Sequence, residues 1–216
     1  MPAINIQRLS NVRKVLVHFI DASNGKHIIT CDASQCSSTT HKGSDTSPKH
    51  YLEAAASNNK VITCIKDSCF YEDSSINGYF VNSEDNATYK IITCNSSSGC
   101  ALPTASEKTD CATAKAGGYI VKSGSSYLCI SDDDSDKVQI KIGATEGIYK
   151  ITIATNDDFP GSTTGDIHVK IYKDGSAILL KDAELKECGN TYVNGIYGLD
   201  STKEKIIYVY YSNNIE

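Results

Sequence analysis

Nine cysteines are the side chains of this 216-residue sequence with the clearest chemistry, because thiols either bind metals or pair as disulfides. Six of them lie in close pairs, which are Cys31 with Cys36, Cys64 with Cys69, and Cys94 with Cys100. His27 and His41 near the first pair would suit zinc. The other two pairs lack such neighbours, no histidine recurs with the motif, and closed zinc sites need a full tetrahedral ligand set. The recurrence therefore favours disulfides, with no metal.

Three cysteines lie outside these pairs. Cys129 has lost its local partner, and Cys111 is the nearest alternative, so we expect these two to be joined. Cys188 is then the odd thiol. A nucleophilic role would need a histidine partner, for which His168 is the only downstream candidate, so a buried or unpaired thiol is the simpler expectation.

Composition indicates an oxidising compartment. Dense cysteine usage is typical of secreted proteins, and the glycosylation sequons at Asn86 and Asn95 agree with secretion, either free or attached to a cell surface. The net charge is −5, without the basic run that a nucleic-acid binder shows. No stretch approaches the about 20 apolar residues of a membrane-spanning helix.

Other candidate chemistry lacks support in the residues. Asp132–Asp136 places carboxylates as a calcium loop begins, but Lys137 and Gly143 stand where the loop needs glycine and glutamate, so a solvated turn is expected. Nothing singles out a carboxylate pair of the glycosidase type. Nucleophile-elbow, phosphate-loop and dinucleotide motifs are missing. We therefore expect no catalytic residues and no cofactor.

The cysteine pairs belong to a larger repeat. Each pair opens with an Ile-Thr-Cys element that has a lysine four or five residues before the cysteine. This first cysteine recurs at intervals of 33, 30 and 35 residues, counting a degraded fourth copy at Tyr127–Ile130. An aromatic-apolar run precedes each element, and the four runs begin at Val17, His50, Gly78 and Gly118. Tyr79 and Tyr119 recur at one position of this run, which predicts core packing rather than a sugar-binding platform.

The repeat predicts short β-strands, because β-branched and aromatic residues dominate each run and Gly, Asn, Asp and Ser lie between them. Two short strands cannot bury an apolar face alone, so the copies should stack, each contacting its neighbours. The pairs Ile28/Ile29, Val61/Ile62 and Ile91/Ile92 should place one side chain in the core and one outward. Helix propensity in Leu52–Ala56 should be overridden.

Past residue 136 the cysteines nearly vanish and strand alternation sharpens. The runs are Val138–Ile142, Ile148–Ile153, Ile167–Tyr172 and Ile206–Tyr210, and they are bounded by turn residues. The sequence thus predicts an all-β chain in three parts. These are an N-terminal segment (1–16), a disulfide-stapled stack (17–136), either solenoid-like or of serial hairpins, and a second β region (137–216), either a sandwich or further coils.

The Gly-Tyr-Phe/Ile-Val-x-Ser start, the Lys-x-Ile-Thr-Cys strand and the closely following cysteine resemble the cysteine-rich repeats of scaffoldin-like proteins from anaerobic gut fungi. The resemblance covers roughly Val17–Asp136. It implies a secreted, non-catalytic scaffold that gathers dockerin-bearing, plant-wall-degrading enzymes into cellulosomes. The alternative is a cell-surface adhesin or a wall protein that binds polysaccharide, and a hydrolase is a third. The linkers Ser37–Lys49, Tyr71–Ile76 and Ala101–Ala116 are the expected binding surface.

Overall fold

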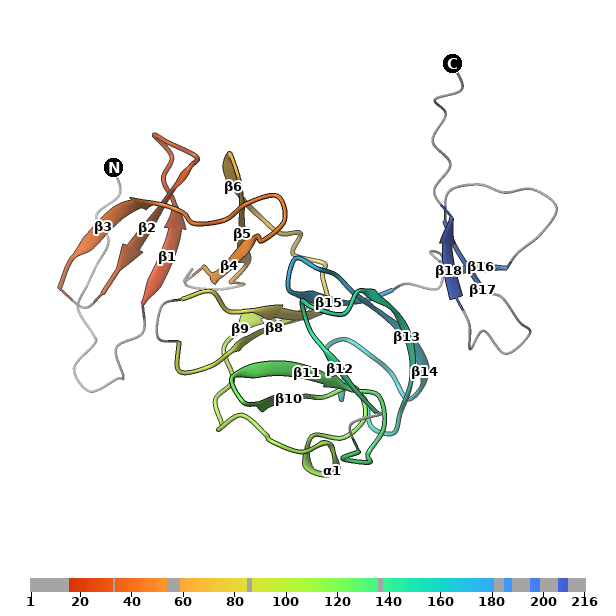
Figure 1. The fold of residues 1–216 in the computed structure, drawn as a ribbon. Helices are drawn as coiled ribbons and strands as arrows, with labels where there is room; N and C mark the ends of the chain where they lie inside the picture. The colour runs from red at the N-terminus through yellow and green to blue at the C-terminus, as the bar shows by residue number, and fades with distance from the viewer. Residues whose placement is uncertain are drawn as a thin grey trace, which may run out of the picture.

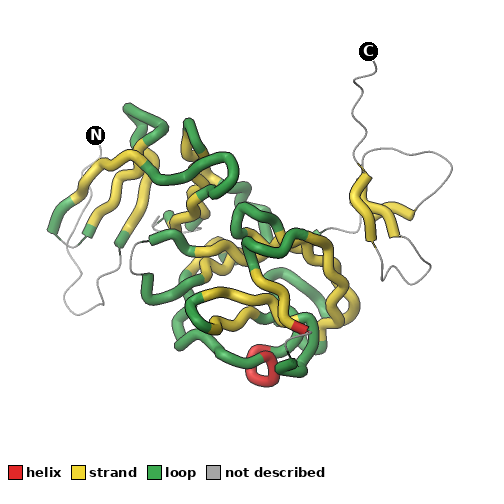
Figure 2. The backbone as a smooth tube through the Cα atoms, viewed as in Figure 1, coloured by secondary structure: helices red, strands yellow, loops and turns green. Residues whose placement is uncertain are grey.

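The computed structural model describes residues 16–32, 34–53, 59–84, 87–135 and 138–180, together with the backbone of three later strands. Those strands are β16 (Leu185–Glu187), β17 (Gly195–Gly198) and β18 (Ile206–Val209), and they form a small sheet in which β17 pairs with both others. Strands dominate the described chain, and the fold is all-β as the sequence predicts (Figures 1 and 2).

Each of the four copies folds as an antiparallel three-stranded meander. The first copy is β1 (Val17–Ile20), β2 (His27–Cys31) and β3 (Cys36–Thr40); the second is β4 (Lys49–Leu52), β5 (Val61–Ile65) and β6 (Ser68–Tyr71). The third is β7 (Gly78–Val81), β8 (Ile91–Asn95) and β9 (Gly99–Ala101); the fourth is β10 (Tyr119–Lys122), β11 (Ser125–Cys129) and β12 (Gln139–Lys141). The third strand of the first copy occupies residues that the sequence assigned to a linker.

A disulfide joins the second and third strands of each of the first three copies. Cys31–Cys36, Cys64–Cys69 and Cys94–Cys100 are direct cross-strand partners, with Cα atoms 3.9, 4.0 and 4.0 Å apart. Cys111–Cys129 is the fourth disulfide and joins α1 (Cys111–Ala114) to β11, with a Cα separation of 5.6 Å. These are the pairs expected from the sequence, and each short hairpin is closed covalently.

The sheets stack in chain order, and the two residues of each apolar pair point to opposite faces. Ile28 of the first copy packs with Ile62 of the second, while Val61 of the second packs with Ile92 of the third. The first residue of a pair therefore faces the following copy and the second faces the preceding one. No apolar cluster of described residues combines the first copy with the third.

The expectation that one residue of each pair points outward is wrong for the inner copies. Val61, Ile62, Ile91 and Ile92 are all fully buried, because these sheets are covered on both faces. Only the first copy follows the expectation: Ile28 is buried and Ile29 is half-buried. Strand alternation was predicted correctly, but the number of covered faces depends on position in the stack.

Backbone hydrogen bonds repeat between neighbouring copies. The N–H of Cys69 donates to the carbonyl of Gly25 at 2.8 Å, and the N–H of Cys100 donates to the carbonyl of Asn59 at 2.8 Å. In both cases the second cysteine of one copy is bonded to the turn that precedes the second strand of the copy before it. The junctions are therefore specified by polar groups as well as by apolar packing.

The third copy also belongs to a larger sheet. Its strands β7–β9 continue into β15 (Ser176–Leu179), β14 (Gly165–Ile171) and β13 (Gly147–Ile153), in the order β13-β14-β15-β7-β8-β9. This sheet contains strands from both sides of residue 136, and β12, from the second region of the sequence, completes the fourth copy. A Cβ at Gly78 would lie 2.2 Å from the Ala177 carbonyl oxygen, so the glycine of the Gly-Tyr run permits the close approach of β7 and β15.

The largest apolar cluster lies between this sheet and the fourth copy. Tyr79, Ile91, Leu128, Phe159 and Val169 are among its buried members. The Tyr79 ring meets those of Tyr119 at 5.3 Å and Phe159 at 5.0 Å, and its hydroxyl donates to the Gly117 carbonyl at 3.1 Å. The recurring tyrosines therefore pack in the core, as predicted. Burial raises the pKa of Tyr79 far above its ordinary value.

Helix is scarce in the described chain. Leu52 ends β4 and Glu53 forms a bridge with His18, so the start of the Leu52–Ala56 run is extended, and its last three residues lie outside the described part. Within the described part, no helix has the length and apolar character needed to cross a membrane.

Candidate functional site

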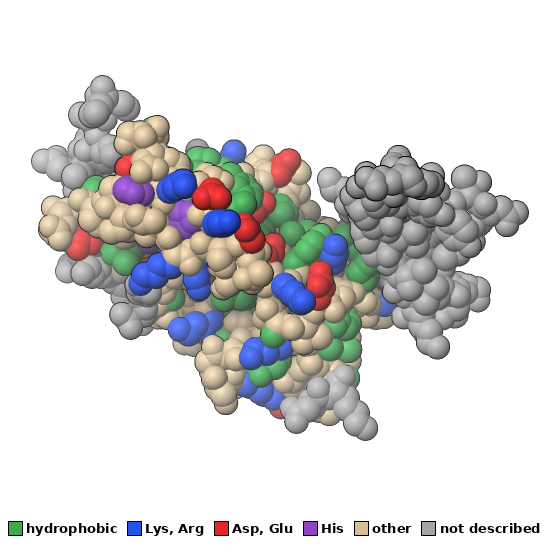
Figure 3. All heavy atoms as spheres, turned by 45° about the horizontal axis from the view of Figure 1, so that its top comes forward, with side chains coloured by type: hydrophobic (Ala, Val, Ile, Leu, Met, Phe, Trp, Pro, Cys, Tyr) green, Lys and Arg blue, Asp and Glu red, His purple; other side chains and the backbone are tan. Residues whose placement is uncertain are grey.

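A polar cleft of about 350 Å³ opens at the junction of the first two copies. Its walls include hydroxyl, imidazole, phenol and charged side chains, namely His18, Thr30, Lys42, Lys49, Tyr51 and Glu84. They come from β1, β2 and β4 and from the segments that follow β3 and β7. Figure 3 shows Lys, His and acidic side chains gathered over the surface at this N-terminal end. Stacking the copies thus brings together residues that are distant in sequence.

His18 is the best-positioned side chain of the cleft. Its Nδ1 lies 3.1 Å from the Thr30 hydroxyl on the paired strand, and its ring lies 5.0 Å from that of Tyr51. Its Nε2 lies 3.8 Å from a Glu84 carboxylate oxygen, which is too long for a direct hydrogen bond. His18 is buried, so threonine and tyrosine fix its ring while glutamate supplies negative charge beside it.

The same His–Thr contact recurs in the second copy. His50 occupies the position of His18, and its Nδ1 lies 3.0 Å from the Thr63 hydroxyl. Its Nε2 donates to the Asp174 carbonyl in the β14–β15 turn, which ties this copy to the six-stranded sheet. Burial lowers the pKa of His50. The expectation that no histidine recurs is therefore wrong; the signal was the His-aromatic-aliphatic run shared by β1 and β4.

His41 lies against the disulfide of the second copy rather than that of the first. One of its ring nitrogens and the sulfurs of Cys64 and Cys69 lie within 4.8 Å of one another. Its Nδ1 accepts a hydrogen bond from the Gly43 N–H at 3.0 Å, and burial lowers its pKa. Because both sulfurs are bonded to each other, this disulfide form offers a metal no thiolate ligand. His27, the other histidine considered for zinc, contacts the Ser38 and Thr40 hydroxyls at 3.2 Å each.

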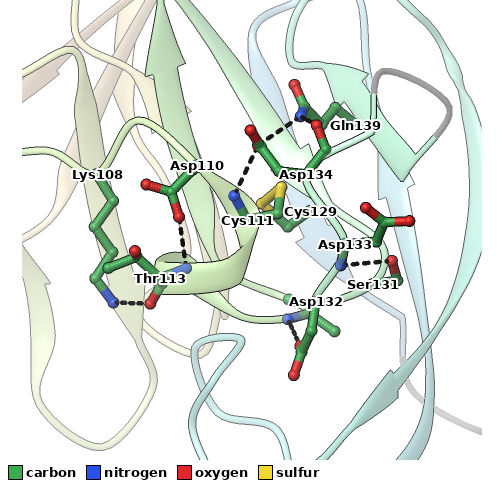
Figure 4. The surroundings of a disulfide bond; sticks show 12 residues. Lys108, Asp110, Cys111, Thr113, Cys129, Ser131, Asp132, Asp133, Asp134 and Gln139 are labelled. Atoms are coloured by element: carbon green, nitrogen blue, oxygen red, sulfur yellow. Dashed lines mark hydrogen bonds between the residues drawn. A yellow bond between two sulfur atoms is a disulfide. The ribbon is translucent and has the colours of Figure 1, made fainter.

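The acidic stretch holds the fourth copy together (Figure 4). Asp134 accepts hydrogen bonds from the Cys111 N–H at 3.1 Å and from the side chains of Lys122 at 3.1 Å and Gln139 at 3.0 Å. Asp132 accepts one from the Ala116 N–H at 2.8 Å. These carboxylates fasten the linker that carries α1 onto the segment that follows β11, so the stretch is more than the solvated turn expected.

Three remaining expectations concern single residues. Cys188 and Asn86 lie outside the described residues. Asn95 ends β8 half-buried, and its side-chain amide oxygen Oδ1 accepts hydrogen bonds from the backbone N–H of Ser97 at 2.9 Å and from the Ser97 hydroxyl at 2.6 Å. The amide of this sequon is therefore already used to close the β8–β9 hairpin.

In chemical terms, the cleft offers lysine and imidazole donors, a carboxylate acceptor and an aromatic ring, which is a set suited to binding a polar ligand. Comparison of the chain with protein-family models, with curated proteins and with solved structures gives no match.

Proposed function

We propose that this chain is a non-catalytic extracellular scaffold module that binds other proteins. The observation that carries the proposal is the repeated exposure of the disulfide-closed hairpins. All five residues of β3 are exposed, and β6 presents Phe70 and Tyr71 with 42% and 39% of their surface open to solvent. Aromatic side chains of this kind are frequent anchors of protein interfaces. Repetition along one stack multiplies weak contacts through effective concentration.

The partners that we propose are dockerin-bearing, plant-wall-degrading enzymes, on the basis of the resemblance between the repeats and those of fungal scaffoldin-like proteins. Four disulfides support an oxidising, extracellular setting, because such bonds persist there.

The geometry of the His–Thr pair supports a binding role over turnover. Thr30, His18 and Glu84 have the residue types of a catalytic triad, but the carboxylate lies 3.8 Å from the imidazole. The equivalent pair in the second copy is buried, and its outer nitrogen is bonded to a backbone carbonyl. Packing explains the buried pair of the second copy.

The test is a pull-down of dockerin-bearing enzymes on the immobilised protein. We expect the double substitution of Phe70→Ser and Tyr71→Ser to weaken capture about tenfold or more. Ser135→Ala, at an exposed position outside the disulfide-closed hairpins, is the control for a polar change. Hydrolysis of a plant-wall polysaccharide by the purified chain, abolished by Glu84→Gln, would refute the scaffold proposal.

A second candidate function, polysaccharide binding, is favoured by the cleft between the first two copies. Sugar hydroxyls both donate and accept hydrogen bonds, and the cleft presents both kinds of partner beside Tyr51. A panel of cellulose, xylan and chitin tests it. Lys49→Ala and Glu84→Gln should each reduce retention, whereas Lys26→Ala, which removes an exposed lysine paired with Asp67, should not. Retention of no polysaccharide, or equal loss in all three variants, would exclude the cleft.

A further inference from the structure

The cleft between the first two copies has positively charged walls, although the protein as a whole is acidic. The chain has a net charge of −5. Among the described residues that line the cleft, the lysines are Lys42 and Lys49 and the one acidic residue is Glu84. His18 and His41 add two imidazoles to the same walls. Two lysines against one glutamate leave an excess of positive charge, so the cleft favours an anionic ligand over a neutral one.

The single carboxylate of the cleft already faces an imidazole. One oxygen of Glu84 lies 3.8 Å from Nε2 of His18, and only 18% of the Glu84 side chain is exposed. Lys42, in contrast, is exposed to solvent. The charge that is most open to an entering ligand is therefore positive.

Hydroxyl groups line the same cleft. The Ser83 hydroxyl oxygen accepts a hydrogen bond from the His50 backbone N–H at 3.1 Å, which leaves its own proton to be donated. Thr39 and Thr40 lie on the exposed strand β3 and also line the cleft. Hydroxyl side chains both donate and accept hydrogen bonds, as sugar hydroxyls do. The Tyr51 side chain adds a flat apolar ring with a polar tip to the wall.

We propose that this cleft binds an acidic polysaccharide, with the carboxylate of a uronic acid unit held by Lys42 and Lys49. Hydrogen bonds between an ammonium group and a carboxylate are roughly twice as strong as those between neutral groups, so the charged unit provides most of the selectivity. The inference rests on the second candidate function, polysaccharide binding, and narrows it to charged polymers. An acidic peptide also carries carboxylates, but the hydroxyl groups and the Tyr51 ring favour a sugar.

Calorimetric titration of the full chain with a short oligogalacturonate tests the proposal. The methyl ester of the same oligosaccharide is the matched ligand, because it has the same backbone without the charge. We expect the acid to bind at least about tenfold more tightly than the ester at low salt. Added salt should reduce this difference, because it screens charges at the surface.

Three lysine variants test the residues. Lys49→Gln should weaken oligogalacturonate binding by about threefold or more, whereas Lys49→Arg keeps the charge and should retain most of the affinity. Lys26→Gln is the control, because it removes an exposed lysine that pairs with Asp67 outside the cleft. Circular dichroism and disulfide mapping check that all three variants fold.

Glu84→Gln gives a result of opposite sign for the two kinds of sugar. It should strengthen oligogalacturonate binding by about threefold or more, because it removes a repulsive charge, whereas a neutral sugar loses an acceptor. Equal affinity for the acid and its ester would overturn this inference and leave polysaccharide binding standing. Binding of neither sugar would overturn both. Binding of an oligoglutamate peptide in place of either sugar would also overturn the inference, because the ligand would then be an acidic peptide.

Discussion

Val61 of the second copy packs against Ile92 of the third, and both side chains are fully buried. Their neighbours in the same strands, Ile62 and Ile91, point to the opposite faces of the two sheets and are also fully buried. Each inner sheet is therefore a layer covered on both sides, as the strands of parallel sheets usually are, although these sheets are antiparallel. Such a layer is sensitive to the loss of volume on either face.

The equivalent isoleucines of two copies should differ in their effect on stability. Ile62→Ala removes a buried side chain between two copies and should cost about 2–5 kcal/mol of unfolding free energy. Ile29→Ala makes the same change at a half-buried position and should cost clearly less. Urea denaturation of both variants gives the comparison. Equal losses would contradict the assignment of inner and outer copies.

The disulfides should contribute unequally to the free energy of unfolding. Cys111–Cys129 closes a loop with a sequence separation of 18, against 5 for Cys31–Cys36. The chain-entropy model then gives about 3 and about 2 kcal/mol for replacing each pair by serine. Thermal and urea unfolding of the two double variants measures the difference. A larger loss from the Cys31–Cys36 replacement would show that hairpin packing outweighs loop entropy.

The fold should weaken on mild acidification. Burial lowers the pKa of both His41 and His50 below 6.5, so the unfolded chain binds protons before the folded chain does. The stabilisation that comes from keeping these two histidines neutral is fully present above about pH 6.5. It is lost as the pH falls from there toward the pKa values of the two histidines in the folded protein. Asp110 and Asp166 have lowered pKa values and stay ionised across this range, so they add no slope.

The measurement for this prediction is the urea midpoint between about pH 7.5 and pH 5. His50→Gln should flatten the dependence, and His27→Gln, which changes a half-buried histidine bonded to two hydroxyls, is the control. A midpoint independent of pH in the unmodified chain would show that both imidazoles accept protons without cost.

Adjacent carboxylates in the acidic stretch should have different effects. Asp134→Asn weakens the acceptor that binds the Cys111 N–H, Lys122 and Gln139, and should cost about 1–3 kcal/mol. Asp133→Asn alters a carboxylate that accepts a hydrogen bond from the local Ser135 N–H, and should have little effect. Hydrogen exchange at the Cys111 amide, with unfolding by urea, distinguishes them. Added calcium should rescue neither variant.

The local elements were predictable because their signals are local. Each Lys-x-Ile-Thr-Cys run forms a strand, and each following cysteine pairs across a hairpin, since β-branched residues and short loops dictate both. The mainly β character follows from the same runs. Burial on both faces was not predictable in this way, because alternation within one strand does not say how many faces neighbours will cover.

The cleft could not be predicted from the sequence, since it depends on contacts between copies. His18 and Glu84 belong to different copies, and only stacking brings them within 3.8 Å. The His–Thr pair is easier to predict from the sequence. His18 and His50 occupy the same position in aligned runs, and a threonine precedes the first cysteine of each pair.

The pairing of β7 with β15 has a consequence for synthesis of the chain. Phe80 in β7 pairs with Ser176 in β15, which is synthesised almost a hundred residues later. The first two copies can close their hairpins during synthesis, whereas β7 of the third copy has an unpaired edge until β15 is made. Contacts this distant in sequence slow folding and expose unpaired edges to aggregation. We therefore expect polypeptides truncated before Gly165 to be poorly soluble, and a helper that shields β7 during translation to raise the yield of native protein.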